Sequence, residues 1–197
     1  LTRRKNMANK DNAFGLKPIG KVGQNDDNQG LSEYKTDNTN NSAIFFQDPV
    51  KALAAGTIGV AAAGDVLLGS FNGCFFTDSS TQKPTFANHL AANNAATDIV
   101  GFVADDPYER FEIQSDNTLA SAQADVFALY DIIYAAGDSA NNVSKVELDD
   151  SSLNTSTGQL KVMGVSKNPD GNDLTTSNVN FVVTINEHFY KAAVAGV

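Results

Sequence analysis

Two apolar runs on either side of a polar corner constrain the fold more than any other stretch of this sequence. Residues 99–104 and 111–113 are rich in Val, Ile and Phe, which favour strands. Between them lies Asp105-Asp106-Pro107. Pro107 fixes its own φ angle and pushes Asp106 toward an extended conformation, and the Asp side chains can accept hydrogen bonds from nearby backbone N–H groups. We therefore predict a strand, a tight corner and a second strand, with Asp105, Asp106 and Pro107 as a structural turn.

The remaining strand signals are short and spread along the chain. The clearest is 179–188, where Val179, Phe181, Val183 and Ile185 fall on one face of the expected strand. Other segments with a strand bias are 43–53, which Pro49 divides into two pieces, 66–76, which is one strand or two divided at Asn72-Gly73, 144–148 and 159–165. Residues 127–135 fit both helix and strand, and we prefer strand for the second half. We expect 127–134 and 179–188 to form part of the core.

This pattern predicts the fold class. Roughly eight to ten short strands without a strong long helix indicate a mainly β fold. We expect an antiparallel β-barrel or β-sandwich with long polar loops, occupying residues 43–190. Residues 77–97 are rich in Thr, Ser, Asn and Ala, and we expect a long exposed loop there with Phe86 and Leu90 as its anchors.

The N-terminal residues 1–42 are polar and glycine-rich, with hydrophobic side chains at irregular spacing. Such a segment cannot bury enough apolar surface to fold alone, but its scattered hydrophobic residues suit docking onto a partner. We predict an extended arm that grips a neighbouring subunit, with an ordinary disordered tail as the alternative. The residues expected to bind the partner are Phe14, Leu16, Pro18 and Ile19. Residues 191–197 are expected to be a small C-terminal tail.

Composition excludes several classes of partner. Lys and Arg number 14 against 23 Asp and Glu, so the net charge is −9, and we expect no nucleic-acid partner and no anionic membrane surface. No apolar run reaches the about 20 residues that span a bilayer. Cys74 is the single cysteine, so neither an internal disulfide nor a Cys-based zinc site can form, and we expect a small buried apolar side chain there.

Residues with catalytic potential are few. Phosphate-binding loops and the Gly-x-Ser-x-Gly motif are absent, and His89 and His188 lie far apart without a second ligand at metal spacing. Asp105 and Asp106, with Glu109 and Glu112 nearby, are candidates for paired acid and base carboxylates of the kind that glycoside hydrolysis needs. The turn is the simpler interpretation of the two aspartates. We therefore predict no catalytic residues, no cofactor and no metal site.

The order and spacing of several short segments resemble one protein family. They are Asn12-Ala13-Phe14-Gly15-Leu16-Lys17-Pro18, Asp48-Pro49-Val50-Lys51, Ala63-Gly64-Asp65, Val103-Ala104-Asp105-Asp106-Pro107, Phe111-Glu112-Ile113-Gln114, Ser144-Lys145-Val146-Glu147-Leu148-Asp149, Leu160-Lys161-Val162-Met163-Gly164 and Ile185-Asn186-Glu187-His188. Over most of residues 7–188 the chain is similar to the head decoration or cement proteins of tailed phages, including marine phages. The loop at 77–97 has no clear counterpart in that family.

The resemblance implies a structural virion protein rather than an enzyme. Such proteins bind the major capsid protein on the outer surface of the head lattice, often as trimers, and brace the shell after it expands. The implied partners are therefore the major capsid protein and two further copies of this chain, and the implied location is the capsid surface of a virion assembled in the host cytoplasm. The alternative is a carbohydrate-binding or adhesin domain of a phage tail or capsid. Asn- and Asp-rich loops and three tyrosines favour that alternative: Tyr108, Tyr130 and Tyr134.

Overall fold

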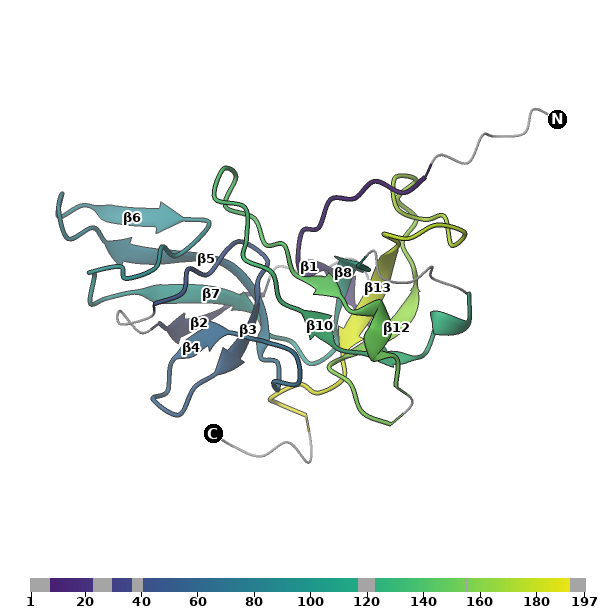
Figure 1. The fold of residues 1–197 in the computed structure, drawn as a ribbon. Helices are drawn as coiled ribbons and strands as arrows, with labels where there is room; N and C mark the ends of the chain where they lie inside the picture. Colours follow the sequence, from purple (N-terminus) through teal and green to yellow (C-terminus); the bar gives the residue numbers. More distant parts are fainter. Residues whose placement is uncertain (1–7, 23–29, 37–40, 117–122, 155, 192–197) are drawn as a thin grey trace.

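The computed structural model describes residues 8–22, 30–36, 41–116, 123–154 and 156–191 (Figure 1). The described residues form β strands with two short 3-10 helices at Gln123–Asp125 and Asp150–Ser152. The strands are β1 (Lys17–Lys21), β2 (Ser32–Lys35), β3 (Pro49–Ala52), β4 (Ile58–Val60), β5 (Gly69–Thr77), β6 (Pro84–Ala87), β7 (Val100–Ala104), β8 (Glu109–Gln114), β9 (Leu129–Tyr130), β10 (Ile132–Ile133), β11 (Glu147–Leu148), β12 (Leu160–Val165) and β13 (Asn180–Ile185).

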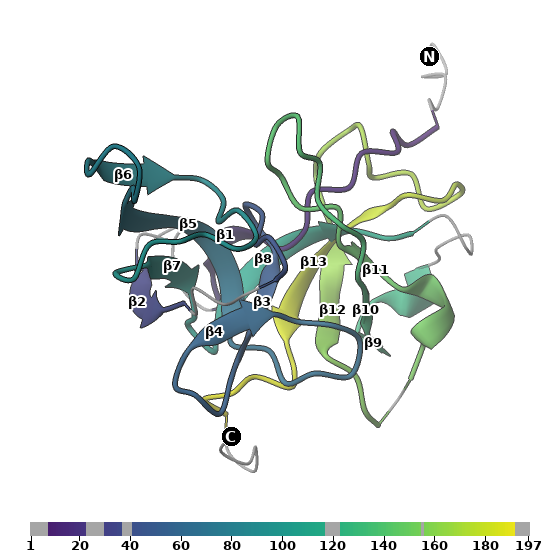
Figure 2. The same ribbon diagram turned by 60° about the vertical axis from the view of Figure 1, so that its left-hand side comes forward.

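Two antiparallel sheets lie side by side, as both ribbon views show (Figures 1 and 2). The first sheet has the order β1-β8-β13-β12-β9, with a separate two-stranded ribbon of β10 and β11. The second sheet has the order β2-β7-β5-β3-β4, and β6 pairs with β5. The predicted mainly β, antiparallel class is confirmed. Among the described residues the arrangement is sandwich-like, and neither sheet closes into a barrel.

The described chain starts in the first sheet, builds the second and then returns. β1 and β8 are paired neighbours in the first sheet, with Lys21 opposite Glu109, whereas β2 to β7 all belong to the second sheet. The tight corner after β7 therefore carries the chain from the second sheet back to the first. The residues of this corner therefore lie at the junction of the two sheets.

Each sheet has its own hydrophobic core. In the first, the predicted apolar face of residues 179–185 is confirmed as part of the core, since Val179, Phe181, Val183 and Ile185 are at most 1% exposed. In the second core, Phe71 of β5 and other buried apolar side chains of the sheet pack together. Aromatic and β-branched side chains dominate both cores because they fill the space above a pleated surface well.

The expectation that residues 1–42 are an arm outside the domain is wrong for two segments. Residues 17–21 form β1 on β8, and residues 32–35 form β2 on β7, so both are edge strands of the sheets. An edge strand uses only one of its hydrogen-bonding sides and is often short and charged, so Lys, Pro and Gly are tolerated in β1. The rest of the expected arm at 1–7, 23–29 and 37–40 lies outside the described residues, as does the expected tail at 192–197.

The segment 77–97 is not simply a long loop. Residues 84–87 form β6, which pairs with β5 so that Phe86 lies opposite Phe75. Leu90 is buried as expected, but Phe86 is 75% exposed and does not anchor the segment in the core. The Asn72-Gly73 pair is an irregularity in the register of the single strand β5 and not a hairpin turn, with Gly73 at a φ of +119°.

The segment 127–135 begins in a turn, with Phe127 at a φ of +77°, continues as two short strands from Leu129, and is only partly buried. Tyr130 of β9 and Ile132 of β10 enter the first core, which agrees with the preference for strand in the second half. Phe127 is 74% exposed, and Ile133 and Tyr134 are also exposed, so the expectation that the whole segment belongs to the core is wrong. The two strands are too short to keep one face buried along the whole segment.

Candidate functional site

The corner between β7 and β8 is a hydrogen-bonded turn. The Glu109 backbone N–H donates to the Asp106 carbonyl oxygen at 2.9 Å, and the Tyr108 N–H donates to Asp106 Oδ1 at 2.8 Å. Asp106 Oδ2 also lies 2.9 Å from Lys21 Nζ at the end of β1. The hydrogen bond from Lys21 is the main cause that lowers the pKa of the Asp106 carboxyl. Asp106 and Pro107 therefore sit in the turn that joins the sheets, and Asp106 ties it to β1.

Asp105 binds the corner to two other segments. Its carboxylate accepts hydrogen bonds from Ser32 Oγ at 2.9 Å and from the Tyr34 hydroxyl, both in β2. The Tyr34 hydroxyl also lies 2.7 Å from that of Tyr190, which follows β13. Burial, and then the bond to Asp105, raise the pKa of the Tyr34 phenol. Ser32, Tyr34, Asp105 and Tyr190 thus form one polar cluster across the two sheets.

His188 is buried next to this cluster with 0% exposure, and its ring centroid lies 5.9 Å from that of Tyr190. Its backbone forms a bridge with Leu67, and its Nδ1 accepts a hydrogen bond from the Tyr190 N–H at 3.1 Å. Burial lowers the pKa of His188 to about 4, because the charged imidazolium would lose its hydration, and the nearby Asp105 only partly offsets this. The ring is therefore neutral near pH 7.

Glu109 is a second buried titratable group beside the corner. It is 3% exposed, and its Oε1 has no hydrogen-bond partner within the described part of the chain. Burial raises the pKa of Glu109 to about 7, although a backbone hydrogen bond from Gly20 favours the charged form. Glu109 and His188 both respond to burial by favouring their neutral forms, so folding couples both groups to pH.

The four acidic residues considered for acid and base chemistry do not form one group. Asp105 and Asp106 hold the corner, whereas Glu112 lies further along β8, opposite Lys17. Glu112 accepts a hydrogen bond from Ser166 Oγ at 2.6 Å and faces Lys17 Nζ at 3.5 Å. The structure thus separates Glu112 from the corner, where Asp106 bonds within the turn and to β1 and Asp105 bonds to β2.

The two histidines also lie in different places. His89 packs against Phe45 with a distance of 6.4 Å between ring centroids, whereas His188 is buried at the junction of the sheets. The described residues contain no group of three His, Cys, Asp or Glu side chains that could hold a metal ion. None of the helices in the described part of the chain has the length and apolar character needed to cross a bilayer.

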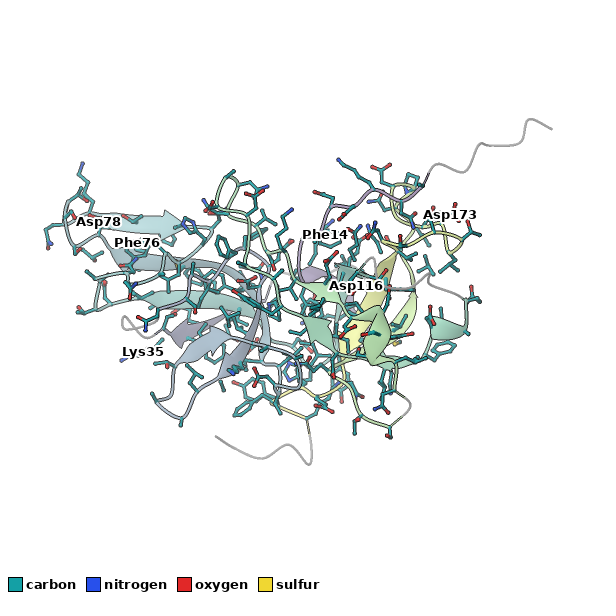
Figure 3. The ribbon with its side chains drawn as sticks, in the orientation of Figure 1. Phe14, Lys35, Phe76, Asp78, Asp116 and Asp173 are labelled. Carbon is teal, nitrogen blue, oxygen red and sulfur yellow. The ribbon has the colours of Figure 1, made fainter. Side chains whose placement is uncertain are left out.

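The residues expected to bind a partner through the arm contact this chain's own domain. Leu16 is 0% exposed in the first core, its N–H donates to the Gln47 carbonyl at 2.9 Å, and its carbonyl accepts from Ser70 Oγ at 2.5 Å. Pro18 lies opposite Phe111 in the β1–β8 pair. Phe14, Pro18 and Ile19 are half-buried, and Figure 3 shows Phe14 close to the start of β1.

Sequence reasoning missed an aromatic face on the second sheet. Phe75 and Phe86 are cross-strand partners with ring centroids 4.8 Å apart, and Phe102 of β7 stacks on Phe86 at 6.3 Å. These three side chains, which we call the aromatic face, lie on the side of the sheet opposite to the core residues Cys74 and Val103. The sequence does place Phe75 next to Cys74 and Phe102 next to Val103, so both phenylalanines are expected on the face opposite to the core. Only the pairing of β6 with β5 brings Phe86 beside them.

No family model matches the chain, and neither the curated proteins nor the solved structures include a match.

Proposed function

We propose that this chain is a structural protein of a phage head, a decoration or cement protein that binds the major capsid protein on the outer surface of the lattice and stabilises the shell. We extend the proposal to a homotrimer on the virion. The resemblance over most of residues 7–188 supports this assignment. A mainly β domain with an exposed apolar surface is consistent with it.

The observation that carries the proposal is the aromatic face. Phe86 is 75% exposed in the isolated chain, and Phe75 and Phe102 extend the same apolar surface. Exposed apolar patches of soluble proteins often mark interaction sites. Fully burying an exposed side chain of this kind contributes about 1.5–3 kcal/mol, so Phe86 supplies most of the expected attachment energy and the half-buried Phe75 and Phe102 supply less. The aromatic face replaces the N-terminal residues as the proposed attachment surface.

The test is binding to expanded shells that lack this protein. The double variant Phe86→Ser/Phe102→Ser should keep its fold, because both side chains lie outside the core, and should bind at least about tenfold more weakly. The matched control is Phe127→Ser, which removes an exposed phenylalanine next to β9, a strand of the other sheet. Co-sedimentation with shells measures the bound fraction.

Cryo-electron microscopy of the decorated shells tests location and symmetry together. Density for three contacting copies on the outer surface, with the aromatic face toward the shell, is the expected result. Absence from the head surface overturns the assignment, and isolated single copies overturn the trimer. Equal shell binding by the double variant and the wild-type chain removes the aromatic face as the attachment surface.

A further inference from the structure

A polar pocket of about 370 Å³ lies against the first sheet, beside residues 8–16, which we call the N-terminal segment. Figure 1 shows this segment running alongside the loop that precedes β13. The pocket is lined by side chains from the N-terminal residues 8–16, from β1, β8 and β13, from Gln47 just before β3, and from the turn at 168–171. Its volume lies within the range of pockets that hold small ligands.

Buried polar side chains form the inner wall of the pocket. Gln114 is 2% exposed, accepts a hydrogen bond from the Asn12 N–H at 2.7 Å, and donates to the Lys10 carbonyl and to Asn180 Oδ1, each at 2.9 Å. Glu112 is 7% exposed and is held by Ser166. These bonds fix both the N-terminal segment and the inner wall, so the pocket is formed before any ligand arrives.

The outer wall is positioned in the same way. The Lys10 N–H donates to the Asp170 carbonyl at 2.9 Å, which joins the N-terminal segment to the turn. Within the turn, Asn168 Oδ1 accepts from the Asp170 N–H at 3.2 Å, and the Asn168 carbonyl accepts from the Gly171 N–H at 3.2 Å. The turn therefore holds Asp170 at the rim.

Several side chains at the rim have unused hydrogen-bonding capacity. The side chains of Lys10, Asn12, Gln47 and Asp170 line the pocket and make no hydrogen bond to other described residues. Side-chain amides offer both donors and acceptors, and this combination matches hydroxyl groups, which also do both. Phe14 adds a half-buried ring that can pack against an apolar ligand face.

The charges of the pocket balance. Lys10 and Lys17 line it together with two carboxylates, those of Glu112 and Asp170. Neither an anion nor a cation is favoured by this lining, whereas a neutral ligand with many hydroxyl groups satisfies the amides without adding charge. We infer that this pocket binds a neutral saccharide, which packs one face on Phe14 and bonds its hydroxyl groups to Asn12, Gln47 and Asp170. This goes beyond attachment to a shell, since the lining of the pocket includes none of the three residues of the aromatic face.

The experiment screens the full chain against an array of neutral hexoses, N-acetylhexosamines and their short oligomers, followed by titration calorimetry with the best binder. Phe14→Ala and Asn12→Ala should each weaken binding by about tenfold or more. The matched controls are Phe127→Ala and Asn172→Ala, which change an exposed phenylalanine and an exposed asparagine outside the pocket. Both controls should bind as the wild type does.

Thermal unfolding of each variant separates lost binding from lost folding. Because Asn12 uses its backbone and not its side chain to hold Gln114, Asn12→Ala should keep the melting temperature of the wild type. An array without any binder overturns the inference, and so does a saccharide whose affinity is unchanged in either Phe14→Ala or Asn12→Ala. Shell binding does not enter this test, so its outcome is independent of the proposed function.

Discussion

At the scale of single residues, Glu109 and His188 couple folding to pH with opposite signs. Burial raises the pKa of Glu109 from 4.5 to about 7, so between these values the folded chain binds more protons there than the unfolded chain. The contribution of Glu109 to the free energy of unfolding is therefore fully present below pH 4.5 and is lost as the pH rises through about 7. Burial lowers the pKa of His188 from 6.5 to about 4, so the unfolded chain binds more protons there, and stability is lost as the pH falls through that window.

The prediction at this scale concerns Glu109→Gln, which keeps the neutral shape of the side chain at every pH. Between pH 4.5 and about 7, the wild-type chain loses stability because its unfolded state ionises at position 109, whereas the variant has no ionisable group there. We therefore expect the unfolding free energy of the variant minus that of the wild type to increase by about 1–3 kcal/mol over this range. Urea unfolding at a series of pH values measures the difference. Glu33→Gln, at an exposed position of β2, is the control. A wild-type-minus-variant difference that stays flat across this range contradicts the prediction.

At the scale of elements, the N-terminal segment is an integral part of the fold, and Gly15 allows it to enter. Gly15 has a φ of +77°, and a Cβ there would lie 2.3 Å from the Gln47 carbonyl oxygen and 2.6 Å from Ser144 Cβ. The next residue, Leu16, is buried in the first core. Both backbone conformation and space therefore exclude any side chain at position 15.

We predict that Gly15→Ala destabilises the chain by more than the strain of a positive φ alone. Gly56→Ala is a matched control, because Gly56 has a φ of +73° but open space around its Cβ position. We expect about 1 kcal/mol for Gly56→Ala, from backbone strain, and a clearly larger loss for Gly15→Ala, from strain and collision together. Chemical denaturation measures both. Equal losses of stability in the two variants would contradict the prediction, because they would mean that the backbone around Gln47 and Ser144 moves to accommodate the new Cβ without a loss of stability.

The elements that could be predicted are those whose pattern is local. Val179, Phe181, Val183 and Ile185 place apolar residues at every second position through β13, and the corner at Asp105-Asp106-Pro107 has its own turn chemistry. β6 pairs with the preceding strand β5 but has only four residues, too few for a clear pattern. β1 and β2 are short edge strands whose pairing partners, β8 and β7, lie far along the chain. The polar pocket could not be predicted either, because its residues are distant in the sequence. Asn12 and Asn180 come close only after β1, β8 and β13 have paired.

At the scale of the whole molecule, the two cores are joined by adjacent residues that point in opposite directions. Leu67 is buried in the first core and Leu68 in the second, and Ala104 and Val103 divide in the same way at the corner. Loss of one core therefore displaces backbone that the other core needs. This continuity predicts that both sheets unfold in one transition, as small single domains usually do.

The thiol of Cys74 can test this coupling, because it is the single cysteine of the chain and lies in the second core. It is 1% exposed, and burial raises the pKa of its thiol to about 11, so a thiol reagent reacts only after the core opens. Phe181→Ala, in the first core, should remove about 3–5 kcal/mol of stability. We expect the opening free energy measured at Cys74 to fall by the same amount, although Phe181 belongs to the other sheet.

The control variant Phe127→Ala, at an exposed position, should leave the opening free energy at Cys74 unchanged. If Cys74 in the Phe181→Ala variant stays as protected as in wild type while the whole-chain stability falls, the sheets unfold independently.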